Sequence, residues 1–239
     1  MTTISSWHDD AFPVTRWSMA TQGFDRPGRS SGEALGELGS RFRYPIYAYL
    51  RHCGHAPAIA EEVMRGFCGT LDGQGMQMPG NARFRGFLLE RLHAWLAEDW
   101  HHVHERADAG LAQADALLEE RHARDHRTTD SPDQAFQRAF ALQVLARALD
   151  RLRSEARQTR HQDMYAVLAP FLGRDPAPGQ CEDIAHALRV RPLTVAIALK
   201  RLRQRLRELA DAELADTVSC ADEFRDEQQA LLAILLPSA

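Results

Sequence analysis

The stretch that decides the fold is Glu182-Asp183-Ile184-Ala185-His186-Ala187-Leu188, followed by Arg189-Val190-Arg191-Pro192 and a long helical pattern over 193–210. In that pattern, apolar residues share one side of the helix at Val195, Leu199, Leu202 and Leu206. The shorter segment has apolar residues that can close over this side at Ile184, Ala185 and Leu188. A short helix, a tight turn and a long helix in this order predict a helix-turn-helix, whose second helix enters the major groove of DNA.

The outer face of the long helix predicts which side chains meet DNA. The predicted DNA-binding set is Arg191, Thr194, Ile197, Lys200, Arg201, Arg203, Gln204 and Arg207. Arginines that flank the face can reach phosphates, which supply affinity rather than sequence choice. An amphipathic helix with a solvated basic surface would show the same charges, and the placement of the turn favours DNA binding.

Two features of this segment depart from the expected pattern. Arg189 stands in the turn where glycine is common, which costs about 1 kcal/mol if the backbone is left-handed. Leu193 and Ile197 place apolar groups on the outer face. These groups can touch thymine methyls or pack against another protein.

Composition limits the function classes. The 239 residues hold 44% hydrophobic and 26% charged residues and a net charge of -4, so contacts with nucleic acid must come from local basic patches. The N-terminus lacks an apolar run, and the longest apolar run, LLAILL, is too short to cross a bilayer. We therefore expect a cytoplasmic protein with no membrane partner. The sequence shows no nucleophile motif, phosphate loop or paired acids, so we expect no catalytic residue, no cofactor and no enzyme activity.

Helical periodicity runs along nearly the whole chain, which predicts an all-α protein of two small helical domains joined by a linker, the second with the helix-turn-helix. The predicted bounds are an N-terminal arm at 1–30, a first domain at 31–105, a linker at 106–130, a second domain at 131–218 and a C-terminal helix at 219–239. Within them, Pro45 should bend or divide a helix over 32–52. Ser131 to Gln134 should form a capping box.

Metal binding is not expected. Cys53, Cys68, Cys181 and Cys220 form no CxxC pair, and without an export signal they are best interpreted as reduced thiols. The run His101-His102-Val103-His104 could suggest a metal site or a pH sensor, but a solvated helix end is the favoured interpretation.

Several short motifs, in order along the chain, resemble the kinase-linked group of extracytoplasmic-function RNA polymerase sigma factors. They are Phe-Pro-Val-Thr-Arg-Trp-Ser at 12–18, Tyr-Pro-Ile-Tyr-Ala-Tyr-Leu-Arg at 44–51, Gly-His-Ala-Pro at 54–57, Arg-Phe-Arg-Gly-Phe-Leu-Leu at 83–89, Arg-Leu-Arg at 201–203 and Glu-Leu-Ala-Asp-Thr-Val at 213–218. Each motif is short, and their order and spacing carry the resemblance.

The resemblance implies a first domain that binds the beta-prime clamp helices of core RNA polymerase and captures the melted minus-ten promoter element. The last domain would read the minus-thirty-five element of promoter DNA. Carried over by position, the polymerase-binding residues are Glu61, Glu62 and Arg65. The residues of the single-strand promoter region are Trp100, His101 and His104. Trp95, which lies on an apolar stripe, is expected in the core.

The chain also departs from this family. Ala58 and Ile59 stand where the family looks acidic, and Met64 replaces a threonine that some relatives offer to a Ser/Thr kinase. After Trp100, histidines and Glu105 replace a basic stretch. A kinase or another regulator therefore remains an expected partner without its usual acceptor site. The alternative is a sigma-derived interaction or regulatory protein that no longer initiates transcription.

Overall fold

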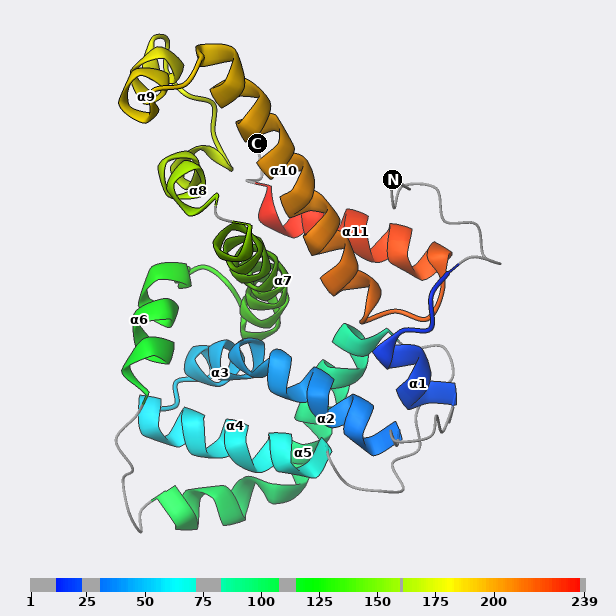
Figure 1. Cartoon of the computed structure of the whole chain (residues 1–239). Coiled ribbons are helices and arrows are strands. Elements are labelled where there is room, and N and C mark those ends of the chain that lie inside the picture. Colours follow the sequence, from blue (N-terminus) through cyan, green and yellow to red (C-terminus); the bar gives the residue numbers. More distant parts are fainter. Residues whose placement is uncertain (1–11, 23–30, 72–82, 108–114, 160, 237–239) are drawn as a thin grey trace. The chain divides into compact units, whose positions relative to one another are not determined.

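The computed structural model describes residues 12–22, 31–71, 83–107, 115–159 and 161–236, and the side chains of 31 and 99–107 lie outside this description. Every regular element in these ranges is helical (Figure 1), which confirms the predicted all-α class. The chain divides into two compact units, a smaller one of residues 144–213 and a larger one from the described parts of 7–143 and 214–239. This division falls inside α7 (Pro132–Gln158) and α10 (Pro192–Ala215), and the predicted domain bounds stay a prediction.

Seven helices in the described ranges lie wholly within the larger unit. They are α1 (Arg16–Gln22), α2 (Ser31–Arg41), α3 (Arg43–His52), α4 (Pro57–Leu71), α5 (Phe84–Ala107), α6 (Ala116–Asp125) and α11 (Ala221–Leu235). The predicted helix over 32–52 is divided at Phe42, so Pro45 lies in the first turn of α3, where its missing N–H costs nothing. Helix α5 begins where the apolar stripe predicts but continues to Ala107, into the segment predicted as linker.

Aromatic side chains from distant parts of the chain form the centre of the larger unit. The ring of Phe42 stacks on Phe140 with centroids 4.3 Å apart, and Phe84 lies 5.5 Å from both Phe42 and Trp17. All four residues are at most 1% exposed. Because large rings remove much apolar area from water, this cluster joins α1, α5 and α7 around the start of α3.

The end of α10 and the loop after it belong to the larger unit through backbone hydrogen bonds. The N–H of Trp17 donates to the carbonyl of Asp216 at 3.1 Å, and the Thr15 hydroxyl donates to the carbonyl of Val218 at 2.7 Å. The N–H of Phe84 donates to the carbonyl of Thr217 at 3.2 Å. Three motifs that carry the family resemblance, at 12–18, 83–89 and 213–218, therefore meet in the fold.

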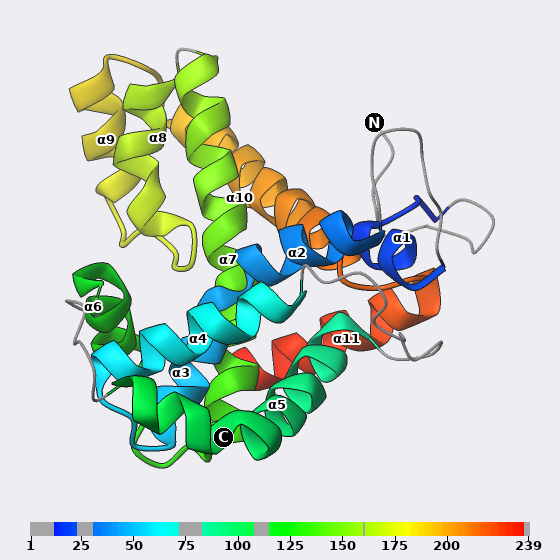
Figure 2. The ribbon, with the colours of Figure 1, turned by 90° about the horizontal axis from the view of Figure 1, so that it is seen from below.

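A buried carboxylate holds α11 to the beginning of α5. Glu227 is fully buried, and Arg85 donates to its two oxygens at 2.5 and 2.9 Å. Arg83 adds contacts to Glu227 at 3.4 Å and to Asp226 at 2.8 Å. Figure 2 shows α11 near α5, as these ion pairs require.

Helix α6, which lies in the segment predicted as linker, is packed against α3 by polar side chains. Glu119 accepts hydrogen bonds from the Tyr47 hydroxyl at 2.6 Å and from Arg51 at 2.8 and 3.1 Å. The Tyr44 hydroxyl donates to Asp125 at 2.9 Å. Arg51, through its hydrogen bonds, holds the pKa of the Glu119 carboxyl below its usual value.

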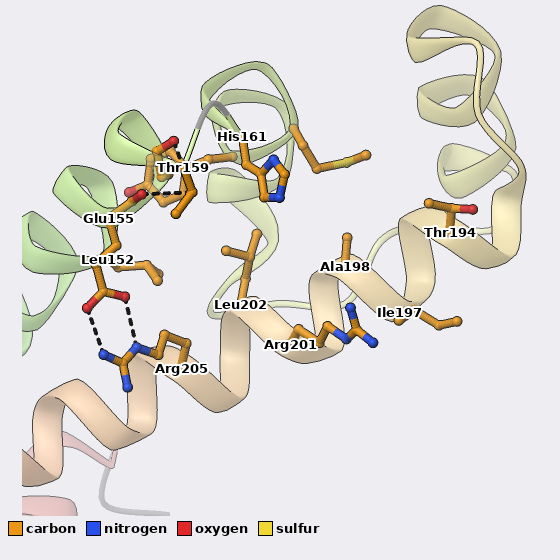
Figure 3. Close-up of a pocket in the computed structure, with 13 residues that line it drawn as sticks. Leu152, Glu155, Thr159, His161, Thr194, Ile197, Ala198, Arg201, Leu202 and Arg205 are labelled. Carbon is orange, nitrogen blue, oxygen red and sulfur yellow. Dashed lines mark hydrogen bonds and ion pairs between the residues drawn. The ribbon is translucent and has the colours of Figure 1, made fainter. Parts of the chain in front are cut away.

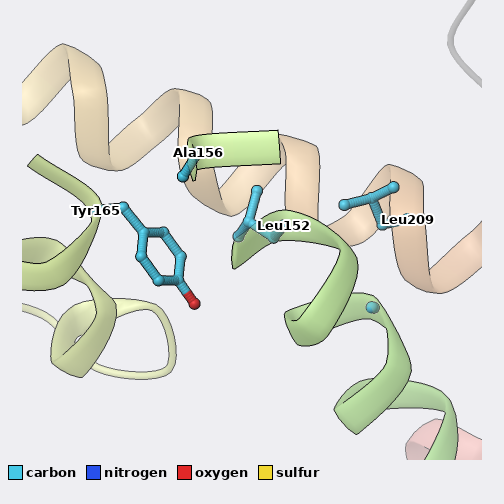
Figure 4. Close-up of a cluster of buried hydrophobic side chains, with 5 residues drawn as sticks. Leu152, Ala156, Tyr165 and Leu209 are labelled. Carbon is cyan, nitrogen blue, oxygen red and sulfur yellow. The ribbon is translucent and has the colours of Figure 1, made fainter. Parts of the chain in front are cut away.

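The smaller unit combines parts of α7 and α10 with α8 (Gln162–Leu168), a short 3-10 helix (Ala169–Phe171) and α9 (Gln180–Leu188). One apolar cluster joins α7 to α8 and α10 through Leu152, Ala156, Tyr165 and Leu209 (Figure 4). A second cluster contains Leu168, Phe171, Ala185, Val195 and Leu199. Most apolar positions predicted for the inner side of the helix pair therefore face a core: Ala185, Val195 and Leu199 are buried there, and Ile184, Leu202 and Leu206 pack against it.

The four cysteines are free thiols, and only Cys53 is exposed. In the described ranges, no helix has the length and the apolar character that crossing a membrane requires.

Candidate DNA-binding face and adjoining groove

The turn between α9 and α10 has the hydrogen bonds of a Schellman motif. The N–H of Val190 donates to the carbonyl of Ala185 at 2.9 Å, and the N–H of Arg189 donates to the carbonyl of His186 at 3.2 Å. Arg189 is left-handed, with φ 54° and ψ 42°, and is the one non-glycine residue with positive φ in the described chain. Arg189 therefore has the left-handed backbone for which the sequence predicts a cost of about 1 kcal/mol.

Helix α10 begins with a residue suited to its position. Pro192 is the first helical residue, where its lack of an N–H leaves no hydrogen bond unmade. The N–H groups of Thr194 and Val195 donate to the carbonyl of Arg191 at 2.9 and 3.4 Å. The turn therefore orients α10 so that Val195 and Leu199 are buried. The opposite face of the helix is exposed to water.

That outer face exposes the residues at the centre of the predicted DNA-binding set. Arg191, Thr194, Lys200 and Arg201 are exposed, as is Ile197 with 43% of its surface in water. Within the described ranges, no side-chain hydrogen bond or ion pair engages Arg191, Thr194, Lys200 or Arg201. Their polar groups are available to a ligand, and three of them carry positive charge.

Arg203 has a different environment from its neighbours. Its guanidinium donates to the carbonyl of Phe171 at 2.8 Å, to that of Arg174 at 2.5 Å and to the Asp175 carboxylate at 2.8 Å. These bonds close the loop after the 3-10 helix onto α10. A phosphate would have to compete with all three partners for the Arg203 donors.

The rest of the basic run is joined in a chain of polar contacts. Arg207 donates to Gln204 at 2.9 Å, and Gln204 donates to Glu208 at 3.3 Å. Arg205 donates to Glu208 at 3.0 Å and to both oxygens of Glu155 at 2.7 and 2.8 Å. The hydrogen bond from Arg205 lowers the pKa of Glu155 and makes the largest contribution to lowering that of Glu208. The positive charge of Arg205 is thereby offset by two carboxylates.

A groove of about 440 Å³ lies beside this face, within the smaller unit (Figure 3). Its wall includes the apolar side chains of Leu152, Ala198 and Leu202, and Ile197 and Arg201 of the outer face also line it. Leu193, one turn before Ile197, is 69% exposed. The same end of α10 thus presents positive charge and apolar surface together.

The predicted polymerase-binding residues lie on α4, and two of them, Glu61 and Arg65, already interact within the protein. Glu61 pairs with Arg65 at 2.6 Å and accepts the backbone N–H of Asp115 at 2.8 Å. Its side chain is 16% exposed, whereas that of Arg65 is 56% exposed. Glu62 is half-buried on the same helix. Glu61 therefore helps to hold the residue that caps α6.

The single-strand region was predicted at Trp100, His101 and His104. These residues belong to α5, but their side chains lie outside the described part of the chain. Trp95, predicted in the core, is half-buried and meets the Phe67 ring edge-on at 5.9 Å.

The structure also brings together three histidines that the sequence analysis did not connect. Ring nitrogens of His52, His122 and His126 lie within 4.8 Å of one another. Burial, and then the charge of Arg51, lowers the pKa of His122 to about 4, so its imidazole is neutral at neutral pH. The spacing of four residues between His122 and His126 on a helix was the available signal, because it places both rings on one face.

Comparison with models of known protein families, with curated proteins and with solved structures produced no match. The likeness to sigma factors therefore rests on the motifs quoted above and stays a prediction.

Proposed function

We propose that this chain is a cytoplasmic sigma-type factor that binds promoter DNA and directs core RNA polymerase to it. The observation that carries the proposal is the outer face of α10, where Thr194, Lys200 and Arg201 are exposed without partners in the described ranges. Positive side chains there can neutralise phosphates, and a helix presented by a tight turn fits the major groove.

The contacts of each residue determine the role that we propose for it. Arg191, Lys200 and Arg201 supply phosphate or base contacts, and Thr194 contributes to the choice of sequence. Arg203 and Arg205 hold the smaller unit together, since their guanidinium groups are engaged by Asp175 and Glu155. Gln204 and Arg207 are a weaker part of the proposed DNA face, because they bond to each other.

The DNA part of the proposal is tested with the double change Lys200→Ala and Arg201→Ala. A duplex selected from a randomised pool by the parent protein serves as the ligand, and fluorescence anisotropy measures affinity over a range of salt concentrations. Because each lost phosphate contact reduces the salt slope by about 0.9, we expect the slope to fall by about two and the affinity by about tenfold or more.

The matched control is Arg225→Ala, which removes an exposed arginine from α11. It should leave DNA affinity unchanged, and thermal melting should show that both variants remain folded. Unchanged affinity and salt slope in the double variant would exclude this face from DNA binding.

A second candidate function is that of a helical interaction protein. It is favoured by the groove beside α10 and by the exposed Leu193 and Ile197, which suit a protein partner better than a phosphate backbone. Run-off transcription with core polymerase on the selected duplex separates the two candidates. Promoter-dependent transcripts support the sigma factor, while DNA binding without transcripts supports an interaction protein.

A further inference from the structure

Three histidine rings lie close together in the larger unit, where α6 packs on α3. His52 is the last residue of α3, whereas His122 and His126 come from α6 and its C-terminal cap. The ring centroids of His52 and His126 are 4.5 Å apart, and those of His122 and His126 are 5.0 Å apart. Their ring nitrogens lie within 4.8 Å of one another, and side-chain rotations would have to bring them closer to bind a single ion.

The cavity beside these rings is small. All three histidines line a cavity of about 10 Å³, together with the carboxylates of Asp125 and Asp130. This volume is close to that of one water-sized sphere, so the cavity suits a single ion or water rather than an organic molecule.

The hydrogen bonds of His52 indicate which of its ring nitrogens would bind an ion. Its Nδ1 lies 2.9 Å from the carbonyl oxygen of Ala48, and its Nε2 lies 3.2 Å from that of Arg127. A neutral ring can donate from only one nitrogen. When Nδ1 donates to Ala48, Nε2 keeps the lone pair that an ion would need, and the ring must turn from the Arg127 carbonyl to bind it. A backbone acceptor behind one nitrogen is also how proteins orient a metal-binding histidine.

The charges around the cavity do not exclude a cation. Arg51 is paired with Glu119 at 2.8 Å, and Arg121 lies 3.5 Å from Asp125. Arg138 also lines the cavity, and its positive charge opposes a cation there. Because Asp125 is already paired with Arg121, Asp130 is the lining carboxylate that remains to offset the charge of Arg138.

We propose that His52, His122 and His126 bind one divalent transition-metal ion, with Zn²⁺ as the best fit, and so join α6 to α3. Three imidazoles are a common zinc ligand set, and a water or a carboxylate completes its tetrahedron. The ion would fix α6 by coordination in addition to the hydrogen bonds of Glu119 and Asp125. This proposal does not depend on the proposed role in transcription.

The test uses the full-length chain without a histidine tag, freed of metal with a chelator. Zn²⁺ is titrated in competition with a chromophoric chelator, and Co²⁺ is added separately as a spectroscopic probe. We expect one Zn²⁺ per chain with a Kd at or below the micromolar range, and the visible bands of tetrahedral Co²⁺. At 100 times the Kd, bound Zn²⁺ should raise the melting temperature by roughly 5–10 °C.

Variants then assign the ligands. His126→Ala removes an exposed ring, so the fold should survive, and the affinity for Zn²⁺ should fall by about 100-fold or more. Two controls should retain the parent's affinity: His186→Ala, at an exposed position on α9, and the triple change of His101, His102 and His104 to alanine. Absence of Zn²⁺ binding by the parent, its persistence in His126→Ala, or its loss in the triple variant would each overturn the proposal. The last outcome would assign the metal to the other histidine run.

Discussion

Within the smaller unit, basic residues at the two ends of α10 have different roles: those near its beginning are exposed, and those further along form ion pairs. Near the beginning, Lys200 and Arg201 are exposed without partners among the described residues. Further along, Arg205 pairs with Glu155, and the buried Glu213 accepts from Arg147 at 2.7 Å and from Arg151 at 2.9 Å. The surroundings make the difference. Glu155 of α7 pairs with Arg205 and Asp175 pairs with Arg203, whereas no described residue pairs with Lys200 or Arg201. A basic run in the sequence therefore does not by itself identify a binding face.

Removing both arginines that enclose Glu213 should have the largest effect. The double change Arg147→Ala and Arg151→Ala leaves a carboxylate that is 4% exposed without a counter-charge. Breaking a buried pair from one side costs about 3–5 kcal/mol, and we expect the free energy of unfolding to fall by about that amount. Urea denaturation measures it.

The matched control for this change is Arg153→Ala with Arg157→Ala, at two exposed positions of α7. This control should alter the free energy of unfolding by no more than about 0.5 kcal/mol per site. If both double variants lowered the free energy of unfolding equally, the ion pairs of Glu213 with Arg147 and Arg151 would not stabilise the protein more than exposed arginines do.

The same carboxylate predicts how stability depends on pH. Burial alone would raise the pKa of Glu213, but the hydrogen bonds and charges of Arg147 and Arg151 outweigh it and hold that pKa below its usual value. A lowered pKa in the folded state stabilises the protein above the unfolded pKa of about 4.3, and this contribution is lost as the pH falls through the folded value.

Glu213→Gln should therefore be less stable than the parent at pH 7, and the difference should shrink as the pH falls below about 4.5. Urea denaturation of both proteins over a pH series measures this difference. A constant difference across the series would show that Glu213 gains nothing from its ionised form.

Arg189→Gly should produce a smaller change, and in the stabilising direction. A side chain in the left-handed region costs about 1–2 kcal/mol, which exceeds the extra backbone entropy that glycine loses on folding. We expect a gain of about 0.5–1 kcal/mol in thermal or urea denaturation. Ala187→Gly, an exposed helical position two residues earlier, is the control and should lose about 1 kcal/mol. If both changes destabilise equally, Arg189 makes a stabilising contact that offsets its backbone cost.

Local signals predicted much of the fold. The sequence predicts a C-terminal helix within 219–239, and the structure gives Ala221–Leu235 for α11. The capping box at the start of α7 is confirmed in both directions. The N–H of Ser131 donates to the Gln134 side chain at 2.8 Å, and the N–H of Gln134 donates to the Ser131 hydroxyl at 3.2 Å. These features depend on residues within one helical turn of each other.

The features that the sequence did not predict depend on distant residues. Arg203 is engaged by carbonyls about thirty positions earlier, and His52 meets His122 only because α6 packs on α3. Helix α10 extends past the predicted end at 210 to Ala215, where Leu214 and Ala215 are buried. Tertiary packing decides each of these, so periodicity along a single segment cannot show them.

The smallest expected effect compares Arg205 with Arg201, one helical turn apart on α10. Arg205→Ala removes a paired and partly exposed guanidinium that joins α10 to Glu155 of α7, and such pairs contribute about 0.2–1 kcal/mol. Arg201→Ala removes a guanidinium without a partner among the described residues, so stability should change by less than about 0.5 kcal/mol. DNA affinity should show the reverse order, with the larger loss in Arg201→Ala. Urea denaturation ranks the two variants by stability, and fluorescence anisotropy ranks them by DNA affinity. If Arg205→Ala weakened DNA binding more than Arg201→Ala, the ion pair with Glu155 would have to open on DNA, and the division of α10 into a structural end and a binding end would be wrong.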